Sequence, residues 1–199
     1  MEELTPAPEK EYSLLMSDED LARKVQSGDT EAFGELVGRY QEKLLRYARK
    51  FLLDPDDAQD IVQDIFIKAY HNMQSFDTSR RFSPWIYRIA HNEFINELKK
   101  RQSRKTTFTI DFDALFPHLQ AVERADTAAL ERDTREILEK HLEKVDAKYR
   151  EPLILYYVEG MDYREIAEIM HLPTSTVGVR LARARGILQK LAKDSKLYG

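Results

Sequence analysis

Apolar residues recur at steps of three and four along most of the chain, a spacing that predicts helices. The longest run begins at Asp29 or Thr30 and places these residues on one face: Phe33, Leu36, Val37, Tyr40, Leu44, Tyr47 and Phe51. A short helix precedes it, with Ser17 as a possible N-cap and Gly28 after its end. No stretch shows a convincing strand pair, so the pattern predicts an all-α fold.

Two more helices are expected before residue 105. Asp54 is a good N-cap, and Pro55 suits the first helical position. The helix that follows would bury Ala58, Ile61, Val62, Ile65, Phe66 and Ala69. The composition of residues 74–84 predicts a loop. Ser83 and Pro84, at its end, start a helix that continues into the basic sequence KKRQSRK.

This last helix has two different faces. Its apolar arc contains Phe82, Ile86, Ile89, Ala90, Phe94 and Leu98, and its polar stripe contains Arg88, Asn92, Asn96 and Lys99. Trp85, the chain's one tryptophan, falls on the seam between them. Partial burial is the ordinary interpretation of such a tryptophan. The alternative is a stacking surface for unpaired bases beside cations and amides, which Phe76, Phe82, Tyr87 and His91 could join.

The helical periodicity fades after residue 105 and resumes near residue 127. We expect helices at about 127–145, 147–158, 162–170 and 174–193. The chain therefore divides into an acidic tail at 1–16, a helical bundle at 17–105, a flexible acidic linker at 106–126 and a second helical domain at 127–199.

The second domain carries a helix-turn-helix pattern. Asp162 is placed to cap a short helix, and Leu172 is placed to fill the turn that follows it. Pro173 and Thr174 begin the last helix, whose inward-facing row is Val177, Leu181, Ala184, Leu188 and Leu191. Hydroxyl groups lie at the start of that helix, where backbone N–H groups favour a phosphate. Thr176, Val179, Arg180 and Arg183 lie away from the inner row. A solvated basic face is the plain alternative to DNA binding here.

The charge distribution supports nucleic-acid contact, although the net charge of −4 does not. Residues 80–105 have a net charge of +6, and residues 174–193 have +5 with no acid. Residues 1–20 have −6, and residues 111–143 have −5. The two basic blocks coincide with the helices whose polar faces are described above.

The helix near residue 60 has an acidic face of another kind. Asp54, Asp56 and Asp57 can cap the helix and complement its dipole. Asp60, Gln63, Asp64 and Ile67 lie opposite the apolar stripe. An exposed acidic face that includes an isoleucine predicts a protein partner rather than DNA.

Several classes of function find no support in the sequence. The chain has no cysteine, which excludes disulfides and Cys-ligated zinc. The histidines do not have the paired spacing of a metal site, and no glycine-rich phosphate-binding loop occurs. The acidic pair at 111–113 is best interpreted as solvent-exposed side chains. We therefore expect no metal, cofactor or catalysis. An acidic start and the lack of a long apolar run predict a cytoplasmic protein without membrane insertion.

Two stretches resemble a known family. The sequence from GDTEAFGELVGRY to HNEFINELKKR resembles region two of the bacterial extracytoplasmic-function (ECF) sigma factors, in the sigma-70 superfamily. The sequence YREPLILYYVEGMDYREIAEIMHLPTSTVGVRLARAR resembles their region four. Together they cover over half the chain in the family's order. The resemblance implies a transcription initiation factor that binds core RNA polymerase, directs it to promoters and helps to melt the minus-ten region.

The resemblance also assigns surfaces by position. It implies that Asp60, Gln63, Asp64 and Ile67 bind the polymerase clamp helices, with a second contact on the flap. The minus-ten element would be captured by Phe76, Arg80, Arg81, Trp85, Arg88, Asn92, Asn96 and Lys99. The minus-thirty-five element would be recognised by Thr174, Ser175, Thr176, Val179, Arg180 and Arg183. An anti-sigma factor as partner, and association with the nucleoid when active, are further implications.

One departure from the family limits what can be transferred. Relatives usually carry a basic and a small polar residue after the Thr-Val pair, where this chain has Gly178 and Val179. No promoter sequence is therefore carried over, although Val179 could touch a thymine methyl group. A stand-alone helix-turn-helix regulator remains the alternative function, but it leaves the acidic helix and the Trp85 helix without a role.

Overall fold

The computed structural model describes residues 16–52, 55–104 and 141–197, and within these segments the side chains of 51, 52, 55–57, 101–104 and 195–197 are left out of account. The described part is helical and contains no strand, which confirms the all-α prediction. The expected tail, except Met16, the expected linker and most of the helix expected at 127–145 lie outside the described residues.

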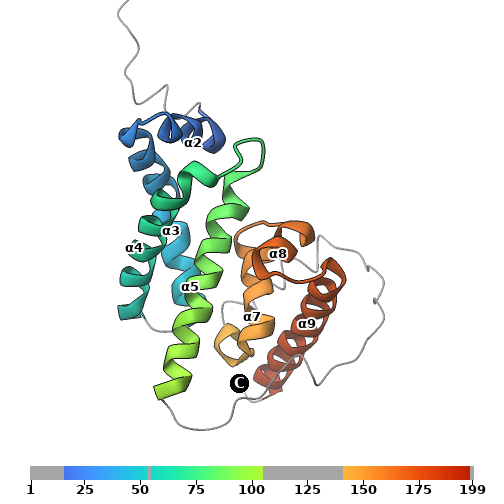
Figure 1. Cartoon of the computed structure of the whole chain (residues 1–199). Helices are drawn as coiled ribbons and strands as arrows, with labels where there is room; N and C mark the ends of the chain where they lie inside the picture. Colours follow the sequence, from blue (N-terminus) through green and yellow to red (C-terminus); the bar gives the residue numbers. More distant parts are fainter. Residues whose placement is uncertain (1–15, 53–54, 105–140, 198–199) are drawn as a thin grey trace, which may run out of the picture.

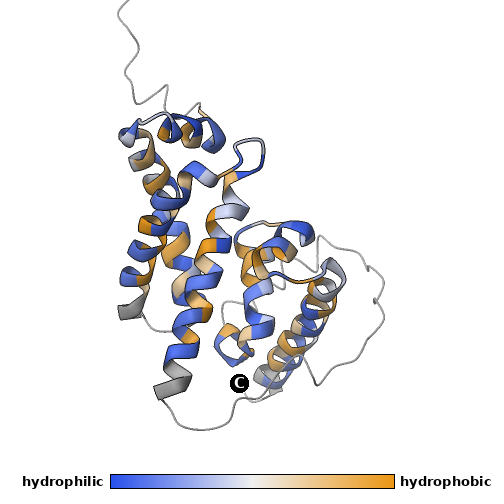
Figure 2. Cartoon of the chain, in the orientation of Figure 1, coloured by the Kyte–Doolittle hydropathy of each residue, from blue (hydrophilic) through white to orange (hydrophobic). Residues whose placement is uncertain are grey.

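Four helices of the first unit fall within the described residues. They are α2 (Asp18–Gln26), α3 (Thr30–Leu52), α4 (Pro55–Asn72) and α5 (Phe82–Arg104), with a 3₁₀ turn η1 (Met73–Ser75) after α4. In Figure 1, α5 runs between the α3–α4 pair and the second unit. Figure 2 shows hydrophobic and hydrophilic residues alternating along these helices, and buried apolar residues such as Leu36, Ile65 and Phe94 form the core between them.

The starts of these helices are set by side chains that accept backbone hydrogen bonds. Ser17 accepts one from Asp20 at 3.0 Å, so the expected cap is confirmed. The long helix starts at Thr30, and the Asp29 carboxylate before it accepts from Glu31 and Ala32. The start of α5 differs from the prediction of Ser83 with Pro84. Its first residue is Phe82, whose N–H donates to Glu19 of α2 at 2.8 Å. A cap from a distant helix leaves no local signal in the sequence.

A partly buried polar contact joins α2 to α3. The Tyr40 hydroxyl donates to one Asp18 oxygen at 2.5 Å, and Arg39 donates to the other at 2.6 Å. Burial, followed by the hydrogen bond to Asp18, raises the pKa of Tyr40 well above its usual value. The phenol therefore stays protonated and serves as a donor that fixes α2 across the bundle.

The second unit contains the helix-turn-helix. It consists of a 3₁₀ turn η2 (Leu142–Lys144), α7 (Ala147–Leu153), a π-helical segment η3 (Ile154–Val158), α8 (Tyr163–Met170) and α9 (Thr174–Leu197). The prediction of one regular helix over 147–158 is wrong in one respect, because the helix widens into a π-turn after Leu153. In this segment the Glu159 N–H donates to the Ile154 carbonyl, five residues back. Gly160 then reverses the chain with φ +71°, a conformation suited to glycine.

Candidate polymerase and nucleic-acid interfaces

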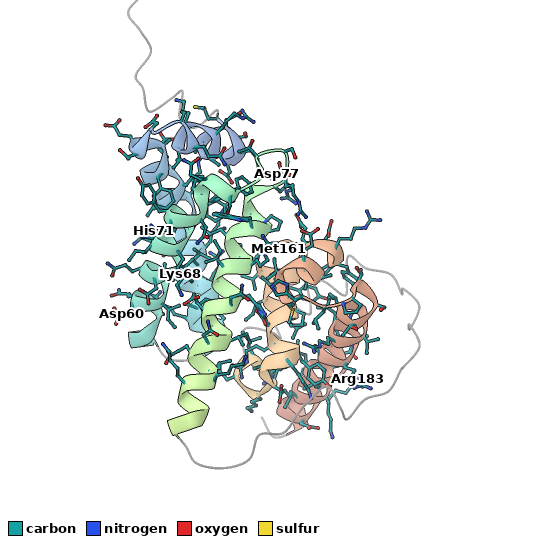
Figure 3. All side chains as sticks on the ribbon, viewed as in Figure 1. Asp60, Lys68, His71, Asp77, Met161 and Arg183 are labelled. Atoms are coloured by element: carbon teal, nitrogen blue, oxygen red, sulfur yellow. The ribbon has the colours of Figure 1, made fainter. Side chains whose placement is uncertain are left out.

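The acidic face of α4 is exposed as predicted. Asp60, Gln63 and Asp64 are exposed, and 48% of the Ile67 surface is accessible, which is unusual for a large apolar residue. Figure 3 shows Asp60 pointing outward from the edge of α4 that is remote from the other helices. The opposite face of α4 packs on α3, where Phe66 meets Phe33 edge to face at 6.4 Å between ring centroids.

A groove runs beside this face between α3 and α4. Its volume is about 660 Å³, and its lining includes Gln63 and Ile67 together with the apolar side chains of Val37, Leu45 and Val62. Tyr70, also in the lining, is 43% exposed and packs against Phe33. An apolar groove bordered by acids suits a protein partner with apolar and basic groups.

The loop before α5 is held in one conformation by several hydrogen bonds. The Gln26 amide donates to the Met73 and Phe76 carbonyls at 2.9 and 2.8 Å. The Asp77 carboxylate accepts from the Ser79 N–H at 3.0 Å and from the Ser79 hydroxyl at 2.7 Å. These two bonds hold the pKa of the Asp77 carboxyl below its usual value. The turn places Arg80 and Arg81 immediately before α5, where each pairs with a glutamate of α8.

Trp85 lies half-buried on the seam of α5, where the sequence placed it. Its ring packs at tilted angles against Phe76 and Phe82, with centroids 5.0 and 5.4 Å away. Both of these partner rings are buried. Phe76 was expected among the DNA-contacting residues, but in this conformation it is buried and packs against the inner face of the Trp85 indole.

The polar stripe continues from Trp85 along α5. Asn92, Asn96 and Lys99 are exposed, and Arg88 is partly exposed. Arg80 and Arg81 have partners, since Arg80 pairs with Glu168 at 2.7 Å and Arg81 pairs with Glu165. The structure thus brings all eight predicted residues to the loop and one side of α5, with its start next to α8.

None of the four residues that the sequence suggested as additions to the Trp85 stacking surface is exposed. Phe76 and Phe82 are buried against Trp85. Tyr87 is 1% exposed and His91 is 9% exposed, because both face the second unit. His91 Nδ1 lies 2.6 Å from Glu151 of α7, and the Tyr87 hydroxyl donates to Glu159 at 2.5 Å. The expectation that they stack on bases is wrong for this conformation.

The same contact contains residues that sequence reasoning missed. The Tyr47 hydroxyl of α3 donates to Glu151 at 2.5 Å, and Arg46 holds Glu159 through two nitrogens at 3.1–3.2 Å. The Glu151 and Glu159 side chains are only 2% and 3% exposed. Burial, followed by the neighbouring carboxylate, raises the pKa of Tyr47 and of Tyr87 above the usual value. The available signal was an acid at each end of the apolar run, in the sequence EPLILYYVE.

The helix-turn-helix is built as the motif predicts. Asp162 accepts from Arg164 and Glu165 at 2.7 and 2.9 Å, and Glu165 accepts from the Asp162 N–H at 2.9 Å, which completes a capping box. His171 ends α8 in the left-handed region with φ 53°, a feature that the sequence did not reveal. The start of α9 is exposed at Thr174 and Ser175.

The other residues expected to contact DNA follow on α9. Thr176, Val179, Arg180 and Arg183 are partly exposed, and Val177 and Leu181 point inward. Arg183 also lies 3.5 Å from the Tyr149 hydroxyl of α7, and Figure 3 shows it on α9. A Cβ atom at Gly178 would lie 3.7 Å from the Tyr163 ring, which is ordinary contact. The glycine therefore is not required by crowding, and it costs the helix about 1 kcal/mol relative to alanine.

The described residues contain neither a candidate metal site nor a candidate membrane span. No group of three or more His, Asp and Glu side chains there is arranged to hold a metal ion. None of the helices in the described ranges combines the length and apolar character that a membrane span requires.

Comparison with known proteins agrees with this division into two units. The family model for sigma-70 region 2 matches residues 36–104, and a model for sigma-70 region 4 matches residues 135–188. The ECF RNA polymerase sigma factor SigW of Bacillus subtilis (strain 168) is 32% identical over 180 residues, which is 86% of this chain and 95% of SigW. The ECF RNA polymerase sigma-E factor of Escherichia coli (strain K12) is 33% identical over 177 residues, 85% of this chain and 91% of that factor.

Two solved structures share the fold. CnrH, in complex with the cytosolic domain of CnrY, superposes with a TM-score of 0.64 and 28% identity, covering 90% of this chain and 99% of CnrH. The sigma factor RpoE of Bartonella quintana, in complex with the anti-sigma factor NepR, gives 0.63 and 29%, covering 82% and 98%. The chain belongs to the ECF family of RNA polymerase sigma factors, the initiation factors that direct RNA polymerase to promoters.

Proposed function

We propose that this chain performs promoter recognition with three separate surfaces, one for polymerase and two for DNA. The observation that carries this proposal is that the region 2 and region 4 matches fall on two helical units, each with an exposed polar surface. As an initiation factor the chain would supply binding and no catalysis. We further propose that it acts in the cytoplasm, at the nucleoid when active, under the control of an anti-sigma factor like the NepR of the RpoE complex.

The acidic α4 face, made of Asp60, Gln63, Asp64 and Ile67, is the proposed contact for the polymerase clamp helices. Its two exposed carboxylates would steer a basic surface toward it, and Ile67 beside the apolar groove would bury area on binding. The expected flap contact would come from the second unit.

The second surface is the strand surface, made of Phe76, Arg80, Arg81, Trp85, Arg88, Asn92, Asn96 and Lys99. A single strand is held by cations that track its phosphates and by an aromatic ring on which a base stacks. The half-buried Trp85, fixed from beneath by Phe76 and Phe82, is rigid enough to form such a platform. We assign it the capture of the opened minus-ten element.

The third surface is the start of α9. A recognition helix enters the major groove with its first residues against base edges. Thr174 and Ser175 are exposed at that end, and Thr176, Val179 and Arg180 follow within two turns. We propose that these residues, with Arg183, bind the minus-thirty-five element.

Truncation of the tryptophan is expected to separate promoter opening from polymerase binding. Stacking on an aromatic side chain contributes about 1–3 kcal/mol per base, so Trp85→Ala should lower the fraction of opened promoter about tenfold or more. Affinity for core polymerase should stay within about twofold of the wild type, because α4 is untouched. Permanganate reactivity of unpaired thymines measures opening, and fluorescence anisotropy of the labelled factor measures polymerase binding.

Trp85→Phe serves as the matched control, since it keeps a ring on the same two neighbours and should retain part of the opening. Circular dichroism of both variants establishes that the first unit is folded. A parallel loss of polymerase binding and helical signal in Trp85→Ala would mean that the indole is a packing residue, and the assignment of the strand surface would then fail.

A further inference from the structure

Helix α2 lies outside the part of the chain that matches sigma-70 region 2, since that match begins at residue 36. It nevertheless packs against η1 and α5. The last residue of α2, Gln26, donates through Nε2 to the Met73 carbonyl at 2.9 Å and to the Phe76 carbonyl at 2.8 Å. The Gln26 carbonyl accepts from the Gln74 amide at 3.0 Å. These bonds tie the end of α2 to the turn that precedes α5.

The Gln26 side chain suits this contact because its amide nitrogen carries two hydrogens. Each of them is donated to a different carbonyl oxygen. A glutamate of the same size would present only acceptors to these two carbonyls, and a methionine would present no donor. A carbonyl that loses its donor in this partly buried position is left unsatisfied. The contact therefore depends on the amide group rather than on the bulk of the side chain.

Both rings that support the Trp85 indole are held through their backbone by α2. Phe76, whose carbonyl accepts from Gln26, is 5% exposed, and its ring centroid lies 5.0 Å from that of the indole. Phe82 is fully buried at 5.4 Å from the indole, and its N–H donates to Glu19 of α2. The two phenylalanine rings also pack on each other at 5.5 Å. A shift of the turn relative to α2 would therefore move the support of the indole.

We propose that Gln26 is a positioning residue of the strand surface, and that α2 thereby takes part in the capture of the opened minus-ten strand. A base stacks best on a ring whose orientation is already fixed, because ordering a mobile ring on binding costs affinity. Gln26 fixes the turn that carries Phe76 under Trp85, and it touches no nucleotide itself. This inference rests on the function proposed for the strand surface.

Gln26→Met tests the inference, because it keeps a side chain of similar length and removes both donors without a change of charge. Gln189→Met is the matched control, since Gln189 is an exposed glutamine of α9 that belongs to none of the three proposed surfaces. Trp85→Ala and the double variant Gln26→Met with Trp85→Ala complete a cycle that shows whether Gln26 acts through the indole. Circular dichroism establishes that each variant is folded.

Two measurements use the full chain. Acrylamide quenching of the fluorescence of the free chain measures the accessibility of Trp85 directly, because the chain has a single tryptophan. Strand capture is measured by anisotropy with holoenzyme, formed from the factor and saturating core polymerase. The labelled DNA is a fork in which the non-template minus-ten strand of a promoter mapped for this factor is already unpaired, so duplex melting does not contribute.

Gln26→Met should raise the quenching constant of Trp85 and weaken fork binding about tenfold, close to the loss expected for Trp85→Ala. The double variant should bind about as weakly as Trp85→Ala alone, because both changes remove the same stacking contact. Gln189→Met should alter neither measurement. Unchanged quenching and fork binding in folded Gln26→Met, or a full second loss in the double variant, would overturn the inference, because Gln26 would then act on stability or at another place.

The same experiment separates this inference from the proposed function. If Trp85→Ala loses fork binding and Gln26→Met does not, the strand surface stands and the role given to Gln26 is wrong. If Trp85→Ala binds the fork normally, the strand surface is misassigned and the inference falls with it. If Gln26→Met fails to fold, Gln74→Met decides the question, because it removes only the exposed donor to the Gln26 carbonyl. Gln74→Met should weaken fork binding about threefold, and unchanged binding in this variant would overturn the inference.

Discussion

Reversal of two charges on α4 is expected to remove most of the affinity for core polymerase. The double variant Asp60→Lys with Asp64→Lys replaces two exposed carboxylates on one face of α4 by ammonium groups. These positive charges would face the basic surface of polymerase that the carboxylates are proposed to attract. Juxtaposed like charges at an interface cost several kcal/mol, so the dissociation constant should rise at least about a hundredfold. Anisotropy of the labelled factor titrated with core enzyme measures the change, and it should shrink at high salt.

The control for this variant is Glu31→Lys, an equally exposed acid in the first turn of α3. It should alter polymerase affinity by less than about threefold, and its effect on stability is confined to the helix dipole, about 0.3–1 kcal/mol. Unchanged affinity in the double reversal, with the fold intact, would remove α4 from the polymerase interface.

The second large effect is on stability. Phe94→Ala should lower the free energy of unfolding of the first unit by about 3–5 kcal/mol, since the ring is fully buried against Tyr47 at 4.8 Å between centroids. Such a loss is a large part of the stability of an ordinary domain. Urea unfolding followed by fluorescence measures it, and because the chain has a single tryptophan, Trp85, the signal reports the first unit alone.

Tyr70→Ala is the comparison for this variant, because Tyr70 is 43% exposed and its ring lies against Phe33 and the adjacent His71. Its cost should be about 1 kcal/mol. Equal midpoints for the two variants would contradict the packing described for the first unit.

The sequence predicted the parts of the site that depend on local patterns. The acidic α4 face, the seam position of Trp85 and the N-cap at Asp162 each follow from the pattern along one helix, and each is confirmed as a placement. Their roles in binding stay predictions. Local patterns do not predict a helix start that depends on a distant residue, such as the start of α5, where the Phe82 N–H donates to Glu19.

The contact between the two units could not have been predicted in the same way. Tyr87 and His91 have the composition of a stacking surface, and only the position of α7 shows that they bind Glu151 and Glu159 instead. These pairs are 60 and 72 residues apart in the sequence, so no periodicity connects them. The π-helical segment after Pro152 also changes the helical register between Glu151 and Glu159. A regular helical wheel does not predict this change.

Run-off transcription on genomic fragments of the organism that encodes the chain tests the central claim most directly. Core polymerase from that organism, with the purified factor added, should transcribe from defined start sites that share sequence elements near minus ten and minus thirty-five. Core polymerase alone should not use these sites. Transcription that is the same with and without the factor, together with no binding of the factor to core polymerase, would contradict the account.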